Sequence, residues 1–387
     1  DGVALTFVSE RVQVSCLGEL KGNQLDGFRD IDATAVITSQ LATLIAGTNI
    51  HATSTLHIIA PKIDLEGNSS FDITLDIGKQ HTVIRGKTTR NKNALDLHAA
   101  ATGVDTHILD AFCNTQGILA DTLGSPMAVE TICENILGEP VIQASGNSPN
   151  ASFETSLTFL GGNVITTKTI PTLAELQLST ELTRHFLKDL GPVLSDIRSI
   201  KKPIELKITN ATAPLSGDIS TLNADVTIDI GEVALDSGSL TMQLLPMFNT
   251  KNVEVIPAHF DTIYISIRNG IATYKKFELT LANKYTIPYS GTINLVNREL
   301  HLKTAVPLTG LGYSIKKLRG LATDIDVPVL ITGTIDKPIV NVDPSFDLGA
   351  ILLELGVGRV LDDVFGGGEN NKPIDPVKLI EDLLGGN

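Results

Sequence analysis

The chain has 387 residues, of which 42% are hydrophobic and only 4% aromatic, and it contains no tryptophan. Its 30 basic and 44 acidic residues give a formal charge of −14. Such a surface repels phosphate backbones and gives no attraction to anionic bilayers, so we expect no nucleic-acid partner. No run of residues reaches the roughly 20 apolar positions that a membrane-spanning helix needs.

Alternation of apolar and polar residues dominates the first hundred positions. A period of two residues is that of a β-strand with one dry and one wet face. Turns with Gly, Asn or Lys separate the runs, which predicts an antiparallel meander. The predicted strands cover residues 3–7, 12–16, 31–37, 53–59, 71–77, 82–86 and 95–99.

Helix-like spacing interrupts this meander twice. Residues 105–137 carry two apolar stripes, divided at 124–126, and we expect helices on both sides of that break. Strands resume over 141–167. Thr172 and Glu175 then form a capping box, and apolar residues recur every fourth position until Gly191-Pro192 ends the predicted helix.

The three cysteines, Cys16, Cys113 and Cys133, match neither a zinc pattern nor a CxxC redox motif. Cys113 and Cys133 both fall in the first helical segment. If its two helices pack antiparallel, a disulfide between these cysteines is one expectation. Two separate buried thiols is the other.

The meander restarts after Pro203, which predicts a boundary near residue 200. We expect residues 1–200 to form a β-meander module with helical insertions. Residues 201–387 should form a second β-module that ends in amphipathic helices. The strands expected early in this second module cover 204–208, 224–230, 240–244, 263–267 and 274–281, with Asn269-Gly270 as a hairpin turn.

The last third of the chain carries the clearest pattern. Apolar residues alternate strictly over 287–295 and 300–306, and Asn297-Arg298 between them suits a hairpin turn. The alternation returns over 327–338 after a basic interruption. Helical spacing then predicts amphipathic helices over 346–365 and 375–384.

The order of these motifs over residues 255–365 resembles the C-terminal region of the AsmA-like family of bacterial envelope proteins, relatives of the bridge-like lipid transfer proteins. The matching segments are Asn269-Gly270 at the start of a strand, 290–295 followed by 298–302, and 327–343 leading into a helix. The resemblance implies a taco-shaped β-groove that is anchored in the inner membrane and reaches across the periplasm. It also implies lipid passage toward the outer membrane, and no reaction.

The sequence contains no motif that carries chemistry. It lacks a GxSxG nucleophile elbow, a P-loop and an HExxH zinc motif, and its eight histidines are scattered. Asp105, His107 and Asp110 lie close in sequence, but the start of a helix favours such acids without a metal. We therefore expect neither an enzyme nor a cofactor or metal.

The apolar face of the last third is the candidate site. Each acyl methylene buried on an open face gains about 0.8 kcal/mol. A second sheet or a helix that covers this face would make it a core instead, and both arrangements demand the same alternation. The candidate groove-lining residues are Ile287, Tyr289, Ile293, Leu295, Leu300, Leu302, Val306, Val327, Val329 and Ile331.

Alternation and resemblance together predict a mainly β protein, an elongated and curled antiparallel meander with helical interruptions and C-terminal amphipathic helices. We expect a phospholipid or another acyl-chain lipid as the partner, together with envelope proteins. A structural periplasmic scaffold with a filled β-core and no lipid is the alternative. The chain opens at Asp1 inside an alternating run, so we expect any signal or anchor to lie upstream. The resemblance implies that such an anchor holds the protein at the inner membrane, in the periplasm.

Overall fold

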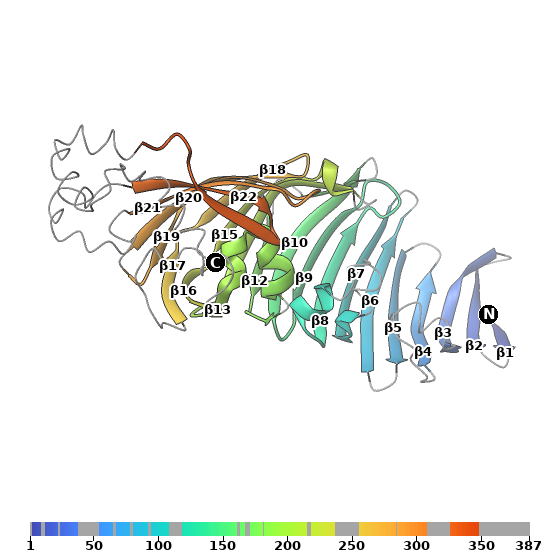
Figure 1. Cartoon of the computed structure of the whole chain (residues 1–387). Coiled ribbons are helices and arrows are strands. Elements are labelled where there is room, and N and C mark those ends of the chain that lie inside the picture. Colours follow the sequence, from blue (N-terminus) through green and yellow to red (C-terminus); the bar gives the residue numbers. More distant parts are fainter. Residues whose placement is uncertain are drawn as a thin grey trace, which may run out of the picture. The chain divides into compact units, whose positions relative to one another are not determined.

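Figure 1 presents the computed structural model of the chain. The structure describes residues 2–8, 12–21, 24–37, 54–64, 67–77, 80–91, 94–107, 118–160, 163–166, 171–180, 182–214, 218–236, 255–283, 285–307 and 326–347. This part of the chain is mainly antiparallel β-sheet, which confirms the predicted fold class. The helices expected over 346–365 and 375–384, apart from Phe346 and Asp347, lie outside the described residues, as does the strand expected over 240–244.

The chain forms two compact units. Unit 1 consists of Asp1–Leu182 and Glu205–Asp218, and unit 2 consists of Thr183–Ile204 and Ile219–Asn387. Each unit is built around its own antiparallel strands, so the apolar faces of the two units are compared separately below.

In unit 1, each of the first ten strands pairs antiparallel with the next strand in the chain. Strand β10 also pairs with β11 and β12, and β11 pairs with β14. The strands are β1 (Gly2–Val8), β2 (Val12–Lys21), β3 (Gln24–Ile37), β4 (Ser54–Asp64), β5 (Gly67–Ile77), β6 (Gln80–Arg90), β7 (Leu95–Val104), β8 (Met127–Glu134), β9 (Val141–Asn147), β10 (Ala151–Leu160), β11 (Asn163–Thr166), β12 (Thr172–Leu176) and β14 (Ile204–Pro214).

The seven strands predicted before residue 100 are all present, but they are longer than the alternating runs. Strand β3 shows why. It passes through Asp30, whose φ is 49°, and the register of β2 against β3 shifts between Ser15 and Leu17. Such a bulge interrupts the period of two while the strand continues. The predicted strand therefore began only after the bulge, at residue 31.

The helical prediction for 105–137 was largely wrong. Among the described residues of this segment, helix is confined to residues 106–107 and to α3 (Ile118–Leu123), whereas Met127–Glu134 is strand β8. Strands β7 and β9 pair with both edges of β8, so its backbone groups are satisfied in the sheet. Cys133 is thus a buried free thiol on a strand, and Cys113 lies outside the described residues. Burial, and then the charges of Asp96 and Glu134, raise the pKa of the Cys133 thiol.

The capping box predicted at Thr172 was also wrong. Thr172–Leu176 is strand β12, and the Thr172 hydroxyl lies 2.6 Å from the hydroxyl of Thr155 on β10 instead of capping a helix. Helical structure starts only near residue 180. It comprises a π-helical turn η1 (Leu182–Leu187), the short α4 (Lys188–Leu190) and a 3-10 turn η2 (Pro192–Asp196).

The strands of unit 2 are also antiparallel, and they pair strictly in chain order only from β19 onward. Strand β13 pairs with β16, and β15 and β16 pair with β18 and β17 respectively. Both β17 and β18 pair with β19, after which each strand from β19 to β23 pairs with the next. The elements are β13 (Ile197–Ile200), the turn η3 (Ile219–Thr221), β15 (Asn223–Asp229), β16 (Gly231–Asp236), β17 (Val255–Phe260), β18 (Ile263–Arg268), β19 (Ile271–Leu281), β20 (Tyr285–Asn294), β21 (Leu300–Pro307), β22 (Asp326–Thr334) and β23 (Lys337–Val342).

Both hairpin turns predicted in the last third are confirmed. Asn269 and Gly270 join β18 to β19 with φ values of 50° and 71°, as a two-residue turn with two left-handed positions requires. The turn between β20 and β21 contains Arg298 with φ of 63°.

We predict that Gly270→Ala lowers the free energy of unfolding by about 1–3 kcal/mol. The left-handed φ disfavours a side chain, and a Cβ on Gly270 would lie 2.7 Å from the carbonyl oxygen of Ile219. Asn269→Gly is the matched control, because glycine adopts this φ freely. Urea denaturation measures both variants. Equal stability of Gly270→Ala and the wild type would contradict this turn geometry.

Candidate functional site

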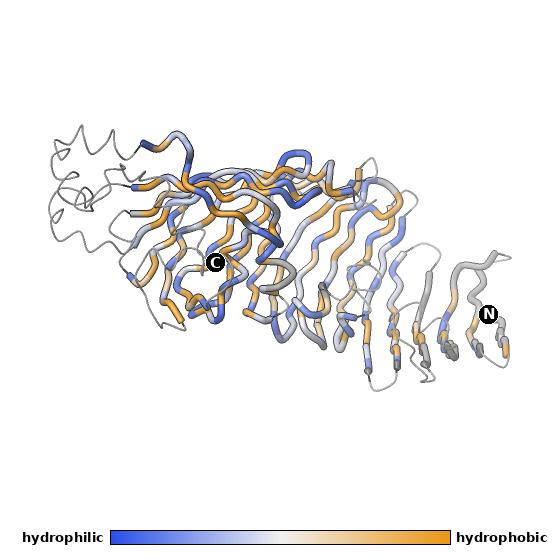
Figure 2. Tube along the Cα trace, in the orientation of Figure 1, coloured by the Kyte–Doolittle hydropathy of each residue, from blue (hydrophilic) through white to orange (hydrophobic). Residues whose placement is uncertain are grey.

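Apolar and polar residues alternate along many of the strands (Figure 2). Since successive side chains of a strand point to opposite faces, this alternation places the two kinds of residue on opposite faces of the sheet. Residues directly paired across antiparallel strands share a face. In unit 1, one row of such pairs crosses nine strands, from β3 to β10 and then β12, without a polar residue. The row is Ala33, Ile58, Ile73, Ile84, Ala101, Val129, Gly146, Phe153 and Ala174.

The charged pairs that cross these strands lie on the other face. Arg85 pairs with Asp72 at 3.1 Å across β5 and β6, and His98 lies 2.8 Å from Glu130 across β7 and β8. His57 lies 2.8 Å from Asp32 across β3 and β4. The sheet of unit 1 is therefore strongly two-sided. Along the apolar row, every residue except the buried Gly146 is only half-buried.

A cavity of about 510 Å³ opens on this apolar face. It lies at the end of the row, over β10, β11, β12 and β14, beside the end of α3. Cavities that bind small ligands commonly measure about 300–1,000 Å³. The residues that line it are Leu123, Met127, Ala151, Ser152, Phe153, Thr155, Leu157, Val164, Thr166, Thr172, Ala174, Leu176, Ile208, Ala211 and Ala213.

The threonine hydroxyls in the cavity lining are engaged by the protein itself. The Thr155 and Thr172 hydroxyls lie 2.6 Å apart and bond each other. The Thr166 hydroxyl oxygen accepts a hydrogen bond of 2.9 Å from the backbone N–H of Ala211. No charged side chain contributes to the lining. The wall therefore offers mainly methyl and methylene groups, which favours an apolar ligand.

The candidate residues predicted from the sequence all lie in unit 2. They alternate on β20, β21 and β22, except for Leu295, which directly follows β20 and is half-buried. The structure buries the other nine, with exposed fractions of 8% or less: Ile287, Tyr289, Ile293, Leu300, Leu302, Val306, Val327, Val329 and Ile331.

The helical turns between β12 and β13 cover this face of unit 2. We call residues 183–196 the cover segment. Its side chains Leu187, Val193 and Leu194 are buried, and the Tyr274 hydroxyl on β19 donates a hydrogen bond to the carbonyl of Leu190. Between the cover segment and the strands, the space beside Tyr289, Ile293 and Leu302 measures only about 20 Å³. A single water molecule needs roughly 10–15 Å³, so this space excludes an acyl chain.

Aromatic residues fill the sheet under the cover segment. The Phe277 and Tyr289 rings stack with their centroids 5.5 Å apart. Burial raises the pKa of both phenols, Tyr274 and Tyr289, and the charge of Asp196 raises that of Tyr289 further. Both phenols therefore stay neutral and act as packing and anchoring groups.

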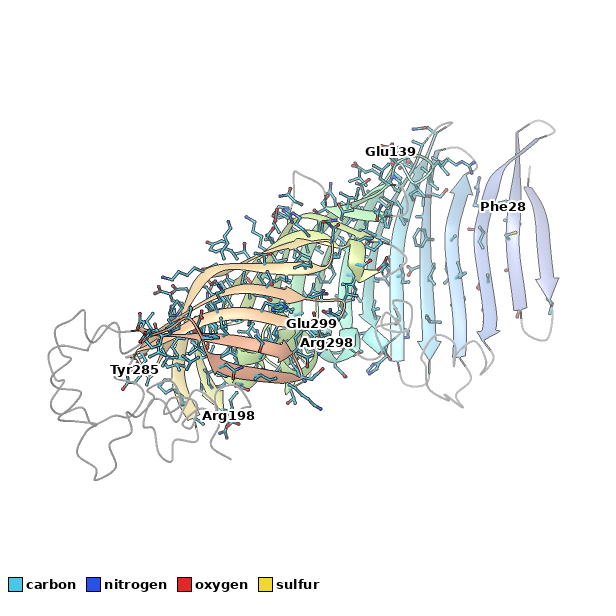
Figure 3. All side chains as sticks on the ribbon, turned by 45° about the horizontal axis from the view of Figure 1, so that its top comes forward. Phe28, Glu139, Arg198, Tyr285, Arg298 and Glu299 are labelled. Carbon is cyan, nitrogen blue, oxygen red and sulfur yellow. The ribbon has the colours of Figure 1, made fainter. Side chains whose placement is uncertain are left out.

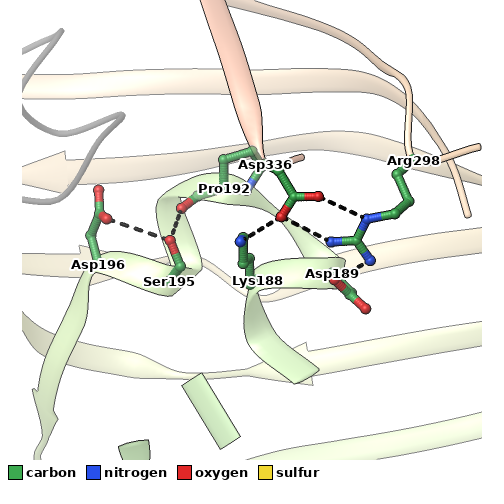
Figure 4. Close-up of polar contacts among 7 residues, drawn as sticks. All are labelled: Lys188, Asp189, Pro192, Ser195, Asp196, Arg298 and Asp336. Carbon is green, nitrogen blue, oxygen red and sulfur yellow. Dashed lines mark hydrogen bonds and ion pairs between the residues drawn. The ribbon is translucent and has the colours of Figure 1, made fainter. Parts of the chain in front are cut away.

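Ion pairs hold the cover segment against two turns of the sheet (Figure 4). Lys188 Nζ lies 2.6 Å from Asp336, in the turn between β22 and β23. Arg298 contacts Asp336 at 3.3 Å and Asp189 at 2.9 Å. Figure 3 shows Arg298 beside Glu299 at the turn between β20 and β21. The hydrogen bond from Lys188, and then the charge of Arg298, lower the pKa of the Asp336 carboxyl.

Sequence reasoning missed the cavity of unit 1. A signal was present, because Ala151, Phe153, Thr155 and Leu157 recur at every second position. Their small and polar members made the pattern weaker than that of the last third. Which strands would meet at β10 could not be read from local alternation.

Comparisons of the chain with protein-family models, with curated proteins and with solved structures found no match. Within the described residues, no helix is long and apolar enough to cross a membrane. The same residues contain no group of three or more His, Cys, Asp or Glu side chains that could hold a metal ion. Asp105 instead bonds His107 at 2.8 Å, and Asp110 lies outside the described part.

We predict that Asp336→Asn lowers the free energy of unfolding by about 0.5–1 kcal/mol at pH 7, a small effect because the ion pairs are exposed. A lowered folded-state pKa stabilises the protein above the unfolded value of about 3.9, and this stabilisation is lost as the pH falls through the folded value. The difference in the free energy of unfolding between variant and wild type should therefore disappear in acid. Thermal unfolding from pH 7 to acid measures it.

Asp326→Asn serves as the control, because Asp326 is an exposed aspartate at the start of β22. It should match the wild type at each pH. If Asp336→Asn remains less stable than the wild type in acid, the loss of stability comes from packing and not from the ion pairs.

Proposed function

We propose that this protein holds the acyl chains of a lipid on the apolar face of unit 1. The observation that carries the proposal is the nine-strand apolar row, half-buried along its length, with a cavity of about 510 Å³ at its end. A large apolar surface left partly in water is unfavourable and commonly marks a binding site. Burial of acyl methylenes there gains about 0.8 kcal/mol each.

The chemistry of the lining favours an aliphatic chain over a polar ligand. A polar molecule would lose hydrogen bonds to water, and the paired Thr155 and Thr172 hydroxyls give little in return. A straight chain laid across the strands would instead contact consecutive members of the row. This geometry suits a lipid that lies along the sheet.

The resemblance of residues 255–365 to the AsmA-like family extends the proposal to the cell envelope. In that setting the protein would lie in the periplasm, anchored to the inner membrane by an upstream segment, and would hold or conduct lipid toward the outer membrane. Envelope proteins would be its partners. This extension rests on the resemblance alone, and the lipid-binding face stands without it.

A structural role is the second candidate, and burial in unit 2 favours it for that unit. The cover segment leaves only about 20 Å³ next to the strands. The groove-lining role of the ten residues named from the sequence stays a prediction, and their burial supports the filled-core alternative. The open apolar face of unit 1 is the better place for cargo.

We predict that Leu157→Asp in unit 1 removes co-purifying lipid but leaves the melting temperature almost unchanged. Leu157 is half-buried and lines the cavity, so a carboxylate there can remain hydrated once the lipid has left. Leu173→Asp is the matched control, because Leu173 is 41% exposed on neighbouring β12, outside the cavity lining. It should keep the lipid.

Leu302→Asp makes the contrasting test in unit 2. Leu302 is 8% exposed beneath the cover segment. An unpaired charge buried there should cost about 3–5 kcal/mol of stability. Mass spectrometry of organic extracts and thermal denaturation are measured on all three variants. If the wild type carries no lipid as purified and binds none when lipid is supplied, the lipid function is rejected and the structural role remains. A stable Leu302→Asp variant that loses lipid would instead restore the groove in unit 2.

A further inference from the structure

Two glycines on the apolar face of unit 1 each lie opposite a phenylalanine on the neighbouring strand. Gly86 on β6 pairs with Phe71 on β5, and Gly146 on β9 pairs with Phe153 on β10. A Cβ on Gly86 would lie 2.3 Å from Phe71 Cζ, and a Cβ on Gly146 would lie 2.5 Å from Phe153 Cε1. Real Cβ atoms do not approach other atoms so closely. Each ring therefore occupies the space that a side chain on the glycine would need.

Backbone conformation does not explain these two glycines. Gly103 and Gly270 adopt left-handed φ values of 71°, whereas neither Gly86 nor Gly146 is among the positive-φ residues. Glycine also weakens the interior of a strand, because it packs no side chain. The close approach of a ring is a reason for glycine at both positions, and at Gly86 the carbonyl oxygen of His98 would also lie 2.9 Å from a Cβ.

The position of the rings has a consequence for the cavity. Strand side chains ordinarily stand nearly perpendicular to the sheet. Here each ring lies over the backbone of the adjacent strand, at the glycine, and so rises less above the sheet. Phe153 lines the cavity, and Gly146 and Phe153 are consecutive members of the apolar row. Phe153, lying over Gly146, thus forms part of the cavity floor.

We infer that the glycine–phenylalanine pairs set the depth of the lipid-binding face, and that Gly146 and Phe153 determine which apolar ligands the cavity accepts. The inference rests on the proposed function. With glycine, the ring stays low and leaves room for a straight chain above it. A side chain at residue 146 lifts the ring into the cavity, and removal of the ring deepens the cavity for bulkier ligands.

The test measures binding of two fluorescent probes to the full chain: cis-parinaric acid, a straight-chain fatty acid, and a dansylated sterol as the bulky probe. Gly146→Val should weaken binding of the fatty acid about tenfold. This loss equals the free energy gained when roughly two methylenes are buried. Phe153→Ala should raise the affinity for the sterol relative to the fatty acid. The double variant Gly146→Val with Phe153→Leu should regain fatty-acid binding, since no ring is left to displace.

Ser145→Val is the matched control, because Ser145 lies beside Gly146 on β9 but is exposed on the polar face. It should bind both probes as the wild type does. Thermal denaturation checks the fold of each variant, and the double variant keeps the test decisive if Gly146→Val is unstable. Wild type that binds neither probe would reject the proposed function itself. Wild type that binds the fatty acid, with unchanged affinities in Gly146→Val and Phe153→Ala, would reject only the depth-setting role.

Discussion

Register between antiparallel strands is the constraint on which the rest of this structure depends. Directly paired residues share a face, so a single apolar position in each strand becomes a continuous row when every register is kept. From Ala33 to Ala174 the row crosses nine strands without a polar member. A slip by one residue in any strand would place charged residues such as Asp72 or Glu130 on the apolar face. The lipid-binding proposal therefore depends on pairing as much as on composition.

The two units use the same alternation and reach different results. In unit 2 the cover segment buries residues such as Tyr289 and Ile293 to exposed fractions of 2% or less. In unit 1 the corresponding faces of the strands stay half-buried, and a cavity of about 510 Å³ opens among them. The strands themselves do not decide between groove and core. What decides is whether another segment packs on the apolar face, here anchored by the hydrogen bond from Tyr274 to Leu190 and by ion pairs of Lys188 and Arg298.

Local sequence was sufficient for most strands and both hairpin turns, because period and turn chemistry act over a few residues. It failed where a distant partner decided the outcome. The Thr172 hydroxyl bonds Thr155, 17 residues away, and Thr172 is therefore in a strand and caps no helix. Cys133 lies on a strand because β7 and β9 are present on both sides of it. The cover over unit 2 depends on a contact between residues 84 positions apart, Leu190 and Tyr274, which no periodicity reports.

The proposed lipid function agrees with the low aromatic content of the chain. An apolar face that binds a ligand needs small side chains that leave space above the sheet. A filled core is instead stabilised by large rings that interdigitate. The stacked Phe277 and Tyr289 lie in the filled unit 2. On the open face of unit 1, Phe71 and Phe153 lie over glycines. Apart from Gly146 and Phe153, the members of the apolar row are Ala, Val or Ile. The chain as a whole has an aromatic content of only 4% and no tryptophan. Under the proposed lipid function, large side chains on this face would take the space of the ligand.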